Sequence, residues 1–264
     1  MEVISEVWRS ELGLHQMTGA TLEHHPTYVV SRPGPDGPED GLVLLRRAPL
    51  ARDAHLVVDL LRSTFPHAPV LRLGVDDPQG RRGDLRPLAD LGFTVALSRV
   101  LTMTSDAVEH DPAGDSWAEI RPLATAADWA DRTQLRRAAL GESTGLARDA
   151  VEHEQVLAAT GRATWLGAFD GAGLLATVGL VSPTPEVALL QDVEVPVDAR
   201  HRGLAAGILA AACRHARSQL GASTLMVVAD PDHPSIGRFE RLGFRDSETQ
   251  LQASVSAERL RSTS

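Results

Sequence analysis

The pattern with the clearest chemical meaning is the turn Arg200-His201-Arg202-Gly203-Leu204-Ala205, which joins an apolar strand pattern to an Ala-rich helix pattern. The first N–H groups of a helix have no partner within it, and the helix dipole places partial positive charge there. Gly203 lets the backbone approach a ligand closely, and Arg200 and Arg202 add formal charge. Together these features predict a site for a pyrophosphate group. Geometry alone leaves open a plain turn with two solvated arginines.

Two better-known phosphate motifs do not match this turn. The dinucleotide fingerprint needs Gly-x-Gly-x-x-Gly, whereas the turn offers only Gly203 and Gly207. A Walker loop needs Gly-Lys-Ser/Thr, and the chain contains no Lys, so that all 26 basic residues are Arg.

Strand-like and helix-like patterns interleave along the chain, which predicts an α/β or α+β fold with a mixed sheet. In the first half we expect helix 2–14, strands 28–31 and 42–46, helix 51–65, strand 70–73, helix 84–91 and strand 94–103. In the second half we expect strand 118–122, helices 126–139 and 148–159, strands 163–169, 174–181 and 187–195, helix 203–220, strand 224–228, helix 234–242 and strand 245–255.

The two halves are similar in outline, because each ends with a short helix, the triplet Leu-Gly-Phe and a strand. The triplets are Leu91–Phe93 and Leu242–Phe244, and they indicate an internal duplication. The best boundary is the segment 105–116, which contains four acids, a Pro and a Gly and has no apolar periodicity. We therefore predict domains at 1–104 and 117–255, a linker at 105–116 and a tail at 256–264.

The second half resembles the GNAT superfamily of acyl-CoA N-acyltransferases over about residues 117–255. The turn Arg200–Ala205 is similar to the family motif Gln/Arg-x-x-Gly-x-Gly/Ala. Residues 232–244 resemble the motif Asn-x-x-Ala-x-x-x-Tyr-x-x-x-Gly-Phe, and residues 119–129 resemble the opening strand and helix. The resemblance implies a GNAT fold, with acetyl-CoA or another acyl-CoA as co-substrate and no metal.

The resemblance also implies how the cofactor is held. In the family, the strand before the turn splays away from its neighbour and pairs with the pantetheine arm, as an added strand would. The cofactor-binding residues implied here are Val193, Val195, Arg200, His201, Arg202, Gly203, Leu204, Ala205, Asp232, Ser235 and Phe239.

The sequence departs from the family at two catalytic positions. Gln191 stands where members often carry a Glu base, and Phe239 stands where the acid is usually Tyr. Neither side chain exchanges a proton. Asp192 and Glu194 are the nearby alternatives, although an ideal strand turns them away from the face of Gln191. A bulge would re-aim one of them. The catalytic candidates are therefore Asp192, Glu194 and Gln191.

The first half contains no matching turn. Its corresponding place, residues 48–53, lacks the glycine that would admit a phosphate. It resembles a shortened, degenerate copy of the same fold, and the alternative is an unrelated small α/β domain. The degenerate copy predicts one acyl-CoA per chain.

Bulk properties narrow the partners. A net charge of −9 argues against nucleic acid as the main partner. The apolar stretches fall short of the ~20 residues of a membrane span. The single cysteine, Cys213, fits a reducing cytoplasm and is expected to be a small buried residue. The pair His24-His25 has no third ligand spaced for zinc.

These observations favour a cytoplasmic N-acyltransferase, in the first instance an N-acetyltransferase, that acts on an amine of a small molecule or peptide. The chain is expected to be a monomer or homodimer. Gln191 and Phe239 keep open a non-catalytic acyl-CoA-binding or regulatory protein. An interaction domain that has lost CoA is the third alternative.

Overall fold

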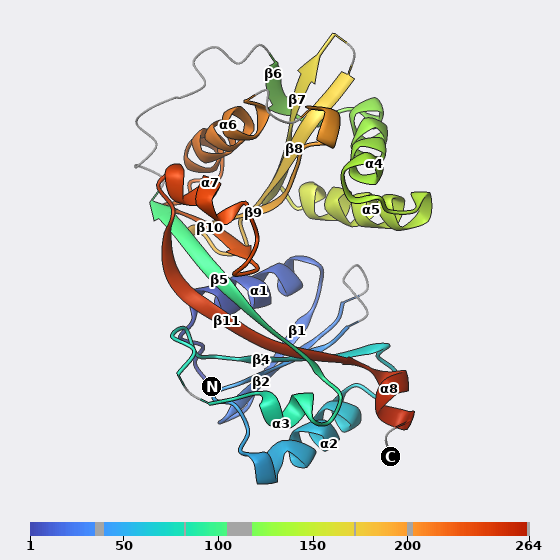
Figure 1. Cartoon of the computed structure of the whole chain (residues 1–264), viewed down its shortest axis with the longest axis vertical. Coiled ribbons are helices and arrows are strands. Elements are labelled where there is room, and N and C mark those ends of the chain that lie inside the picture. Colours follow the sequence, from blue (N-terminus) through green and yellow to red (C-terminus); the bar gives the residue numbers. More distant parts are fainter. Residues whose placement is uncertain (35–39, 82, 105–117, 172, 200–202, 263–264) are drawn as a thin grey trace. The chain divides into compact units, whose positions relative to one another are not determined.

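A computed structural model describes residues 1–34, 40–81, 83–104, 118–171, 173–199 and 203–262 (Figure 1). Helices and strands alternate along these residues, so the predicted mixed α/β class is confirmed. The chain forms two compact units. Unit 1 comprises Met1–Leu101 and Val228–Ser264, and unit 2 comprises Thr102–Val227.

Unit 1 is built on a mixed sheet with strand order β1-β2-β3-β4-β11-β5. Strands β3 and β4 are parallel and are joined through α2, whereas β1–β2, β2–β3 and β4–β11 are antiparallel. The elements are α1 (Glu6–Met17), β1 (Thr21–His24), β2 (Tyr28–Arg32), β3 (Leu42–Leu45), the 3-10 turn η1 (Ala51–Asp53), α2 (Ala54–Thr64), β4 (Val70–Val75), α3 (Arg86–Ala89), β5 (Thr94–Thr104), α7 (Ile236–Arg241), β11 (Arg245–Ser256) and α8 (Ala257–Ser262).

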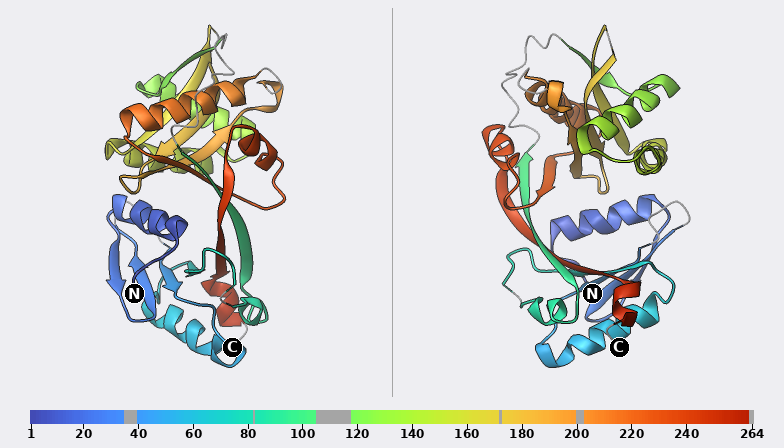
Figure 2. Two further views of the ribbon diagram at one scale, coloured as in Figure 1. Left: turned by 90° about the vertical axis from the view of Figure 1, so that its left-hand side faces the viewer. Right: turned by 45° about the vertical axis from the view of Figure 1, so that its right-hand side comes forward.

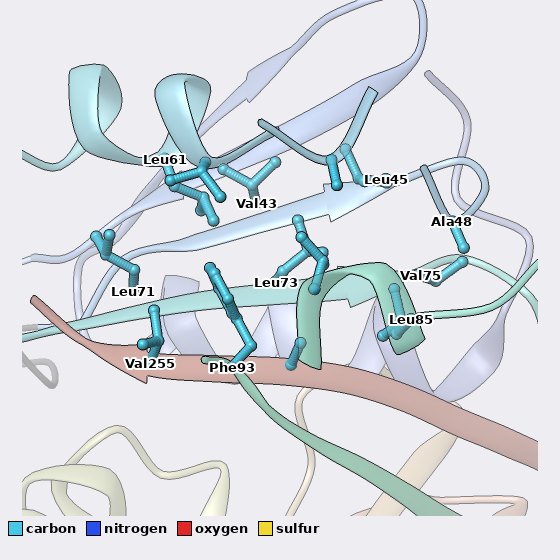
Figure 3. Close-up of a cluster of buried hydrophobic side chains, with 14 of the residues drawn as sticks. Val43, Leu45, Ala48, Leu61, Leu71, Leu73, Val75, Leu85, Phe93 and Val255 are labelled. Atoms are coloured by element: carbon cyan, nitrogen blue, oxygen red, sulfur yellow. The ribbon is translucent and has the colours of Figure 1, made fainter. Parts of the chain in front are cut away.

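The main core of unit 1 lies between this sheet and the helices α2 and α3 (Figure 3). Alternate residues of the parallel strands, such as Val43 and Leu73, point into it, because successive side chains of a strand face opposite ways. Leu61 of α2 and Phe93 after α3 complete the packing. Both strands are apolar on this face, which explains why their pattern could be recognised from sequence.

Helix α1 covers the other face of the sheet. Its Trp8 has no exposed surface, and the indole Nε1 donates to the carbonyl oxygen of Val75 at 2.7 Å. The ring lies over Gly74, where a Cβ atom would come within 2.4 Å of it. Gly74 is therefore required by the close approach of the Trp8 ring.

A carboxylate from the far end of the sequence holds the first turn of α1. Glu248 of β11 accepts from the backbone N–H groups of Glu6 at 2.9 Å and Val7 at 3.1 Å, and from the hydroxyl of Ser5 at 2.7 Å. These N–H groups have no partner within the helix, and the helix dipole favours a negative charge beside them. Glu248 therefore fastens α1 to β11.

We predict that Glu248→Gln lowers the free energy of unfolding by about 1–2 kcal/mol, because the charged acceptor for two free N–H groups is lost. Urea denaturation followed by circular dichroism measures this. The control is Glu2→Gln, since Glu2 is exposed, and it should change stability by less than about 0.5 kcal/mol. Equal stability of the two variants would contradict the role given to Glu248.

Unit 2 is built on a sheet with strand order β10-β9-β8-β7-β6, in which β9 and β10 are parallel and the other pairs antiparallel. Helix α6 covers one face, and α4 and α5 cover the other (Figure 2). The elements are β6 (Glu119–Pro122), α4 (Ala126–Leu140), α5 (Thr144–Ala159), β7 (Ala163–Asp170), β8 (Gly173–Val181), β9 (Val187–Glu194), the 3-10 turn η3 (Val197–Ala199), α6 (Leu204–Gln219) and β10 (Thr224–Ala229).

The start of α4 shows how the sequence sets these boundaries. Thr125 and Asp128 form a reciprocal capping box, and Gly141 ends the helix in the left-handed conformation at φ 71°. Arg121 holds the same Asp128 carboxylate at 2.9 and 3.0 Å and stacks on the ring of Phe169, which ties β6 to the helix. Arg121 keeps the pKa of Asp128 well below its ordinary value.

The element order predicted from sequence is reproduced, with differences at short elements and at the start of α5, which begins at Thr144 and not near Arg148. Strand β1 and helix α8 were not predicted, and helix 84–91 shortens to Arg86–Ala89, with Pro87 in its first turn. The predicted linker 105–116 lies outside the described residues. Residues from Val228 onward pack in unit 1, where β11 pairs with β4, so the compact units do not coincide with the two halves of the sequence.

Candidate functional site

The parallel strands β9 and β10 pair over only part of their length. Their register joins Val187–Leu189 to Thr224–Met226 and ends there, although β9 continues to Glu194. Beyond Leu189, no strand in the described part of the chain pairs with β9 on the side of β10. Such an edge can pair with an extended ligand as an added strand would.

A bulge interrupts β9 within this unpaired part. Gln191 lies opposite Gly179 of β8, and Glu194 lies opposite Thr177, so three steps on β9 match two on β8. Asp192 occupies the extra position with φ 48°. Among the described residues it is the only non-glycine residue with a positive φ. Because residues opposite Gly179 and Thr177 face the same way, the bulge brings Glu194 to the face of Gln191.

The far end of this segment leads into α6. Gly203 precedes the helix with φ 78°, a conformation that favours glycine, and its carbonyl oxygen accepts from the N–H groups of Ala206 and Gly207 at 3.1 Å. A Cβ atom at Gly203 would meet nothing within 4 Å, so the space beside it is open. Leu204 is buried and Ala205 is half-buried. The predicted residues Arg200, His201 and Arg202 lie outside the described residues.

Three other predicted cofactor residues lie in unit 1. Asp232 is exposed, and Ser235 is half-buried, with its hydroxyl 2.6 Å from the ring of His233. Phe239 is 5% exposed and packs edge-on against Phe244 at 5.6 Å between centroids. Its side chain thus belongs to a packed apolar contact, as expected for a Phe on an apolar helix face.

The face to which Glu194 turns holds a buried ion cluster that the sequence analysis did not predict. Arg132 of α4 has no exposed surface. Its guanidinium donates to Glu154 of α5 at 2.7 and 3.0 Å and to Glu194 at 2.6 and 3.3 Å. Both carboxylates are 5% exposed. Glu194, a predicted catalytic candidate, is therefore fully engaged with an arginine.

A second arginine joins the edge of this cluster. Arg136, one turn after Arg132 on α4, donates to Glu142 at 2.9 Å, to Glu194 at 3.2 Å and to Asp192 at 3.3 Å. Asp192 differs from the buried carboxylates because its side chain is 41% exposed. The bulge thus separates two neighbouring acids into one buried and one accessible group.

Burial and pairing act against each other in the cluster. Burial lowers the pKa of the Arg132 guanidinium, but Glu154 and Glu194 outweigh it and leave the pKa above its ordinary value. Burial raises the pKa of Glu154, and Arg132 opposes this shift. The sequence signal for the cluster was an arginine on the same helical face as the buried residues Asp128 and Leu135.

We predict that Arg132→Met lowers the free energy of unfolding by about 3–5 kcal/mol, because it leaves two buried carboxylates without their main partner. Thermal and urea unfolding measure the change. Arg148→Met is the matched control, since Arg148 is 66% exposed and should contribute less than about 1 kcal/mol. A loss no larger than that of the control would show that the cluster does not stabilise unit 2.

Cys213 is buried in α6, as the sequence analysis expected, and burial raises the pKa of its thiol to about 12. Among the described residues, no group of three His, Cys, Asp or Glu side chains is arranged to hold a metal ion. No helix in the described part of the chain combines the length and apolarity needed to cross a membrane.

The place in unit 1 that corresponds to the turn before α6 is built differently. Strand β3 pairs with β4 over its whole length, from Leu42 to Leu45, and α2 follows through the 3-10 turn η1. A cavity of about 730 Å³ lies here, bordered by Arg46, Arg47 and Pro49 among others. No glycine lies in the segment 46–53. Unit 1 thus repeats the strand–helix–strand connection without the free strand edge.

Comparison with known proteins identifies the class of fold. The chain is similar to a GCN5-related N-acetyltransferase from Kribbella flavida, with 15% identity, a TM-score of 0.62, and coverage of 93% of this chain and 95% of that one. A functionally unknown conserved protein from Staphylococcus epidermidis gives a TM-score of 0.75 at 13% identity, with 90% and 95% coverage. A tandem GNAT protein from the clavulanic acid biosynthesis pathway gives 0.58 at 17% identity, with 94% and 87% coverage. The fold is that of GNAT acetyltransferases.

A family match covers just under half of the chain. Residues 121–244 match the Acetyltransferase (GNAT) family. This confirms the resemblance drawn from the turn at Gly203. No match was found among curated protein sequences.

Proposed function

We propose that this protein transfers an acyl group, in the simplest case an acetyl group, from acyl-CoA to the nitrogen of an amine. The observation that carries the proposal is the unpaired edge of β9 beyond Leu189, which leads directly into the turn before α6. The GNAT family domain at residues 121–244 supports acyl transfer in general. The choice of an acetyl group as the acyl chain and of an amine as the acceptor are the parts that we propose.

The described residues fit the cofactor. The backbone of Val193, on the part of β9 beyond its pairing with β10, would pair with the pantetheine arm, and Val195, just after β9, is a further contact implied by the family resemblance. The turn Arg200–Ala205 would hold the pyrophosphate, since the open space beside Gly203 admits a phosphate and the helix end attracts it. By resemblance to the family, Asp232, Ser235 and Phe239 are also proposed as cofactor-binding residues.

The reaction needs one proton removed and one supplied. The amine nitrogen attacks the thioester carbonyl carbon, the C–N bond forms and the C–S bond breaks. The ammonium proton must leave, and the thiolate must gain a proton. Gln191 and Phe239 exchange no proton, so we assign most of the rate enhancement to positioning and to polarisation of the carbonyl, with water carrying protons.

We further propose that the first half is a degenerate copy of the same fold that holds no CoA. The full-length pairing of β3 with β4 supports this, because it leaves no free edge for a pantetheine arm. The tandem GNAT similarity over 94% of the chain agrees with such an arrangement. The protein is proposed to act in the cytoplasm, as a monomer or homodimer, on a small-molecule or peptide amine.

One alternative rests on a specific observation. Gln191 stands at the usual position of the base, and Phe239, at the usual position of the acid, is packed against Phe244. A protein that binds acyl-CoA without transferring the acyl group would tolerate both substitutions. The alternative is a regulatory acyl-CoA-binding protein.

We predict CoA release from acetyl-CoA in the presence of a panel of amines, measured with a thiol reagent. Gly203→Trp should abolish it, because the indole fills the space beside the helix end. Gly203→Ala should retain it, with a stability loss of about 1–2 kcal/mol from the positive φ. Tight CoA binding without turnover on any amine would favour the regulatory alternative. Turnover that is unchanged in Gly203→Trp would show that CoA does not bind beside Gly203.

We also predict one acetyl-CoA per chain in isothermal titration calorimetry. Arg202→Glu should remove this binding, because it reverses a charge beside the pyrophosphate. Arg47→Glu, at the cavity of unit 1, should leave it unchanged. A stoichiometry of two, with one site lost in Arg47→Glu, would contradict the degenerate copy.

A further inference from the structure

The cavity of unit 1 carries an inference about a second ligand, separate from the acyl-CoA proposed for unit 2. It has a volume of about 730 Å³ and lies where strand β3 leads into α2, with the segment before α3 as its other wall. Proteins bind small molecules in cavities of roughly 300–1,000 Å³. All of its lining residues belong to unit 1, so the cavity is a property of one compact unit.

The two walls of the cavity are held together by packing. Ala48 is buried, and Gly83 lies so close to it that a Cβ atom at Gly83 would come within 2.7 Å of the Cβ atom of Ala48. Gly83 also has φ 129°, a conformation that favours glycine. Leu85 and Leu88, which follow it, are part of the buried core. The space between the two segments is therefore set by the fold.

Two positive charges line this cavity without a carboxylate partner. The side chains of Arg46 and Arg47 are exposed, and neither makes an ion pair or a hydrogen bond with another described residue. By contrast, Arg32, Arg72 and Arg99, on strands of the same sheet, are each paired with a carboxylate. Acidic residues outnumber arginines by 35 to 26 in this chain, so a shortage of carboxylates does not explain two adjacent unpaired arginines.

Asp84 also borders the cavity, but its charge is already paired. Its carboxylate accepts from the backbone N–H of Arg86 at 2.8 Å and forms an ion pair with the guanidinium of the same residue. These hydrogen bonds keep the pKa of Asp84 below its ordinary value, so the carboxylate is ionised at neutral pH and is offset by Arg86. The positive charge of Arg46 and Arg47 is therefore left in excess at the cavity.

Most of the remaining lining is apolar. Ala48, Pro49, Leu50 and Pro87 contribute hydrocarbon surface, and the large side chain of Leu50 is 55% exposed. Apolar surface gains free energy when a ligand removes it from water. A ligand that combines a negative charge with an apolar body would therefore complement both parts of the lining.

We propose that this cavity binds an organic carboxylate with an aromatic or aliphatic body. Arg46 and Arg47 hold the carboxylate by charge-assisted hydrogen bonds, because a planar guanidinium matches its two oxygen atoms. Pro49 and Leu50 contact the body. A carboxylate carries a single charge, so its desolvation against apolar walls costs less than that of a phosphate dianion. The pantetheine arm of CoA is excluded, since β3 pairs with β4 as far as Leu45.

Isothermal titration calorimetry with naphthylacetate and octanoate tests the charge. In the double variant Arg46→Gln, Arg47→Gln, binding should weaken about 10- to 100-fold, because hydrogen bonds between charged groups are lost. Naphthylacetamide has the same rings without the charge, so it should bind the unaltered protein more weakly and should not respond to the double variant. Arg52→Gln is the matched control, since Arg52 is 81% exposed and lies outside the lining, and it should leave binding unchanged.

A second pair of variants tests the apolar wall. Leu50→Glu should abolish binding of both carboxylates, because it removes apolar surface and places a negative charge beside the arginines. Leu56→Glu is its control, since Leu56 is 66% exposed on α2 and lies outside the lining. It should bind as the unaltered protein does. Circular dichroism verifies that both variants, which alter exposed side chains, are folded.

The inference and the proposed function fail separately. Acetyl-CoA binding and CoA release should be the same in the double variant as in the unaltered protein. If neither carboxylate binds, or if both bind all variants equally, the inference is overturned whatever the outcome for acyl transfer. Tighter binding of naphthyl phosphate than of naphthylacetate would overturn the choice of a carboxylate. A second acetyl-CoA that is lost in Arg47→Glu would assign the cavity to CoA and would also overturn it.

Discussion

The architecture of unit 2 depends on one buried guanidinium group, that of Arg132, which must be paired with carboxylates. Moving an ion out of water costs several kcal/mol, so Arg132 with no exposed surface requires partners from the elements around it. Glu154 supplies one from α5 and Glu194 supplies another from β9. Glu194 faces α4 only because β9 contains an extra residue at Asp192. The ion cluster and the bulge therefore require each other, and each explains why the other persists.

The bulge also connects packing with the proposed binding edge. A bulge bends its strand and increases the local twist, which draws the strand away from a straight neighbour. Pairing with β10 ends at Leu189, just before the bulged residues. The same extra residue thus leaves the edge unpaired on one side and turns a carboxylate into the core on the other. Because of the bulge, the side chains of Gln191 and Glu194 lie on the same face of β9.

Much of this arrangement follows from the sequence, and the exceptions have physical causes. The turn at Gly203, the elements around it and the α/β class follow from apolar period and from glycine placement, which are local signals. The short strand β1 was missed because Thr21–His24 has no alternating burial pattern. Its extended conformation depends on pairing with β2, which is not a local signal. The role of Arg132 was missed because its partners lie 22 and 62 residues away: the helical face it shares with Leu135 indicates that Arg132 is buried, but not which carboxylates pair with it.

The two strand–helix–strand connections show what a binding edge needs beyond the fold. Both β3–α2–β4 and β9–α6–β10 join parallel strands through a helix. In unit 1 the strand pairs with its neighbour to its last residue, Leu45, and arginines and a cavity lie beyond it. Charge and space are thus present there, but the free backbone is absent. Backbone pairing is what orients an extended ligand. The bulge at Asp192 is therefore the determining difference between the two connections, and among the described residues it lies in β9–α6–β10 and not in β3–α2–β4.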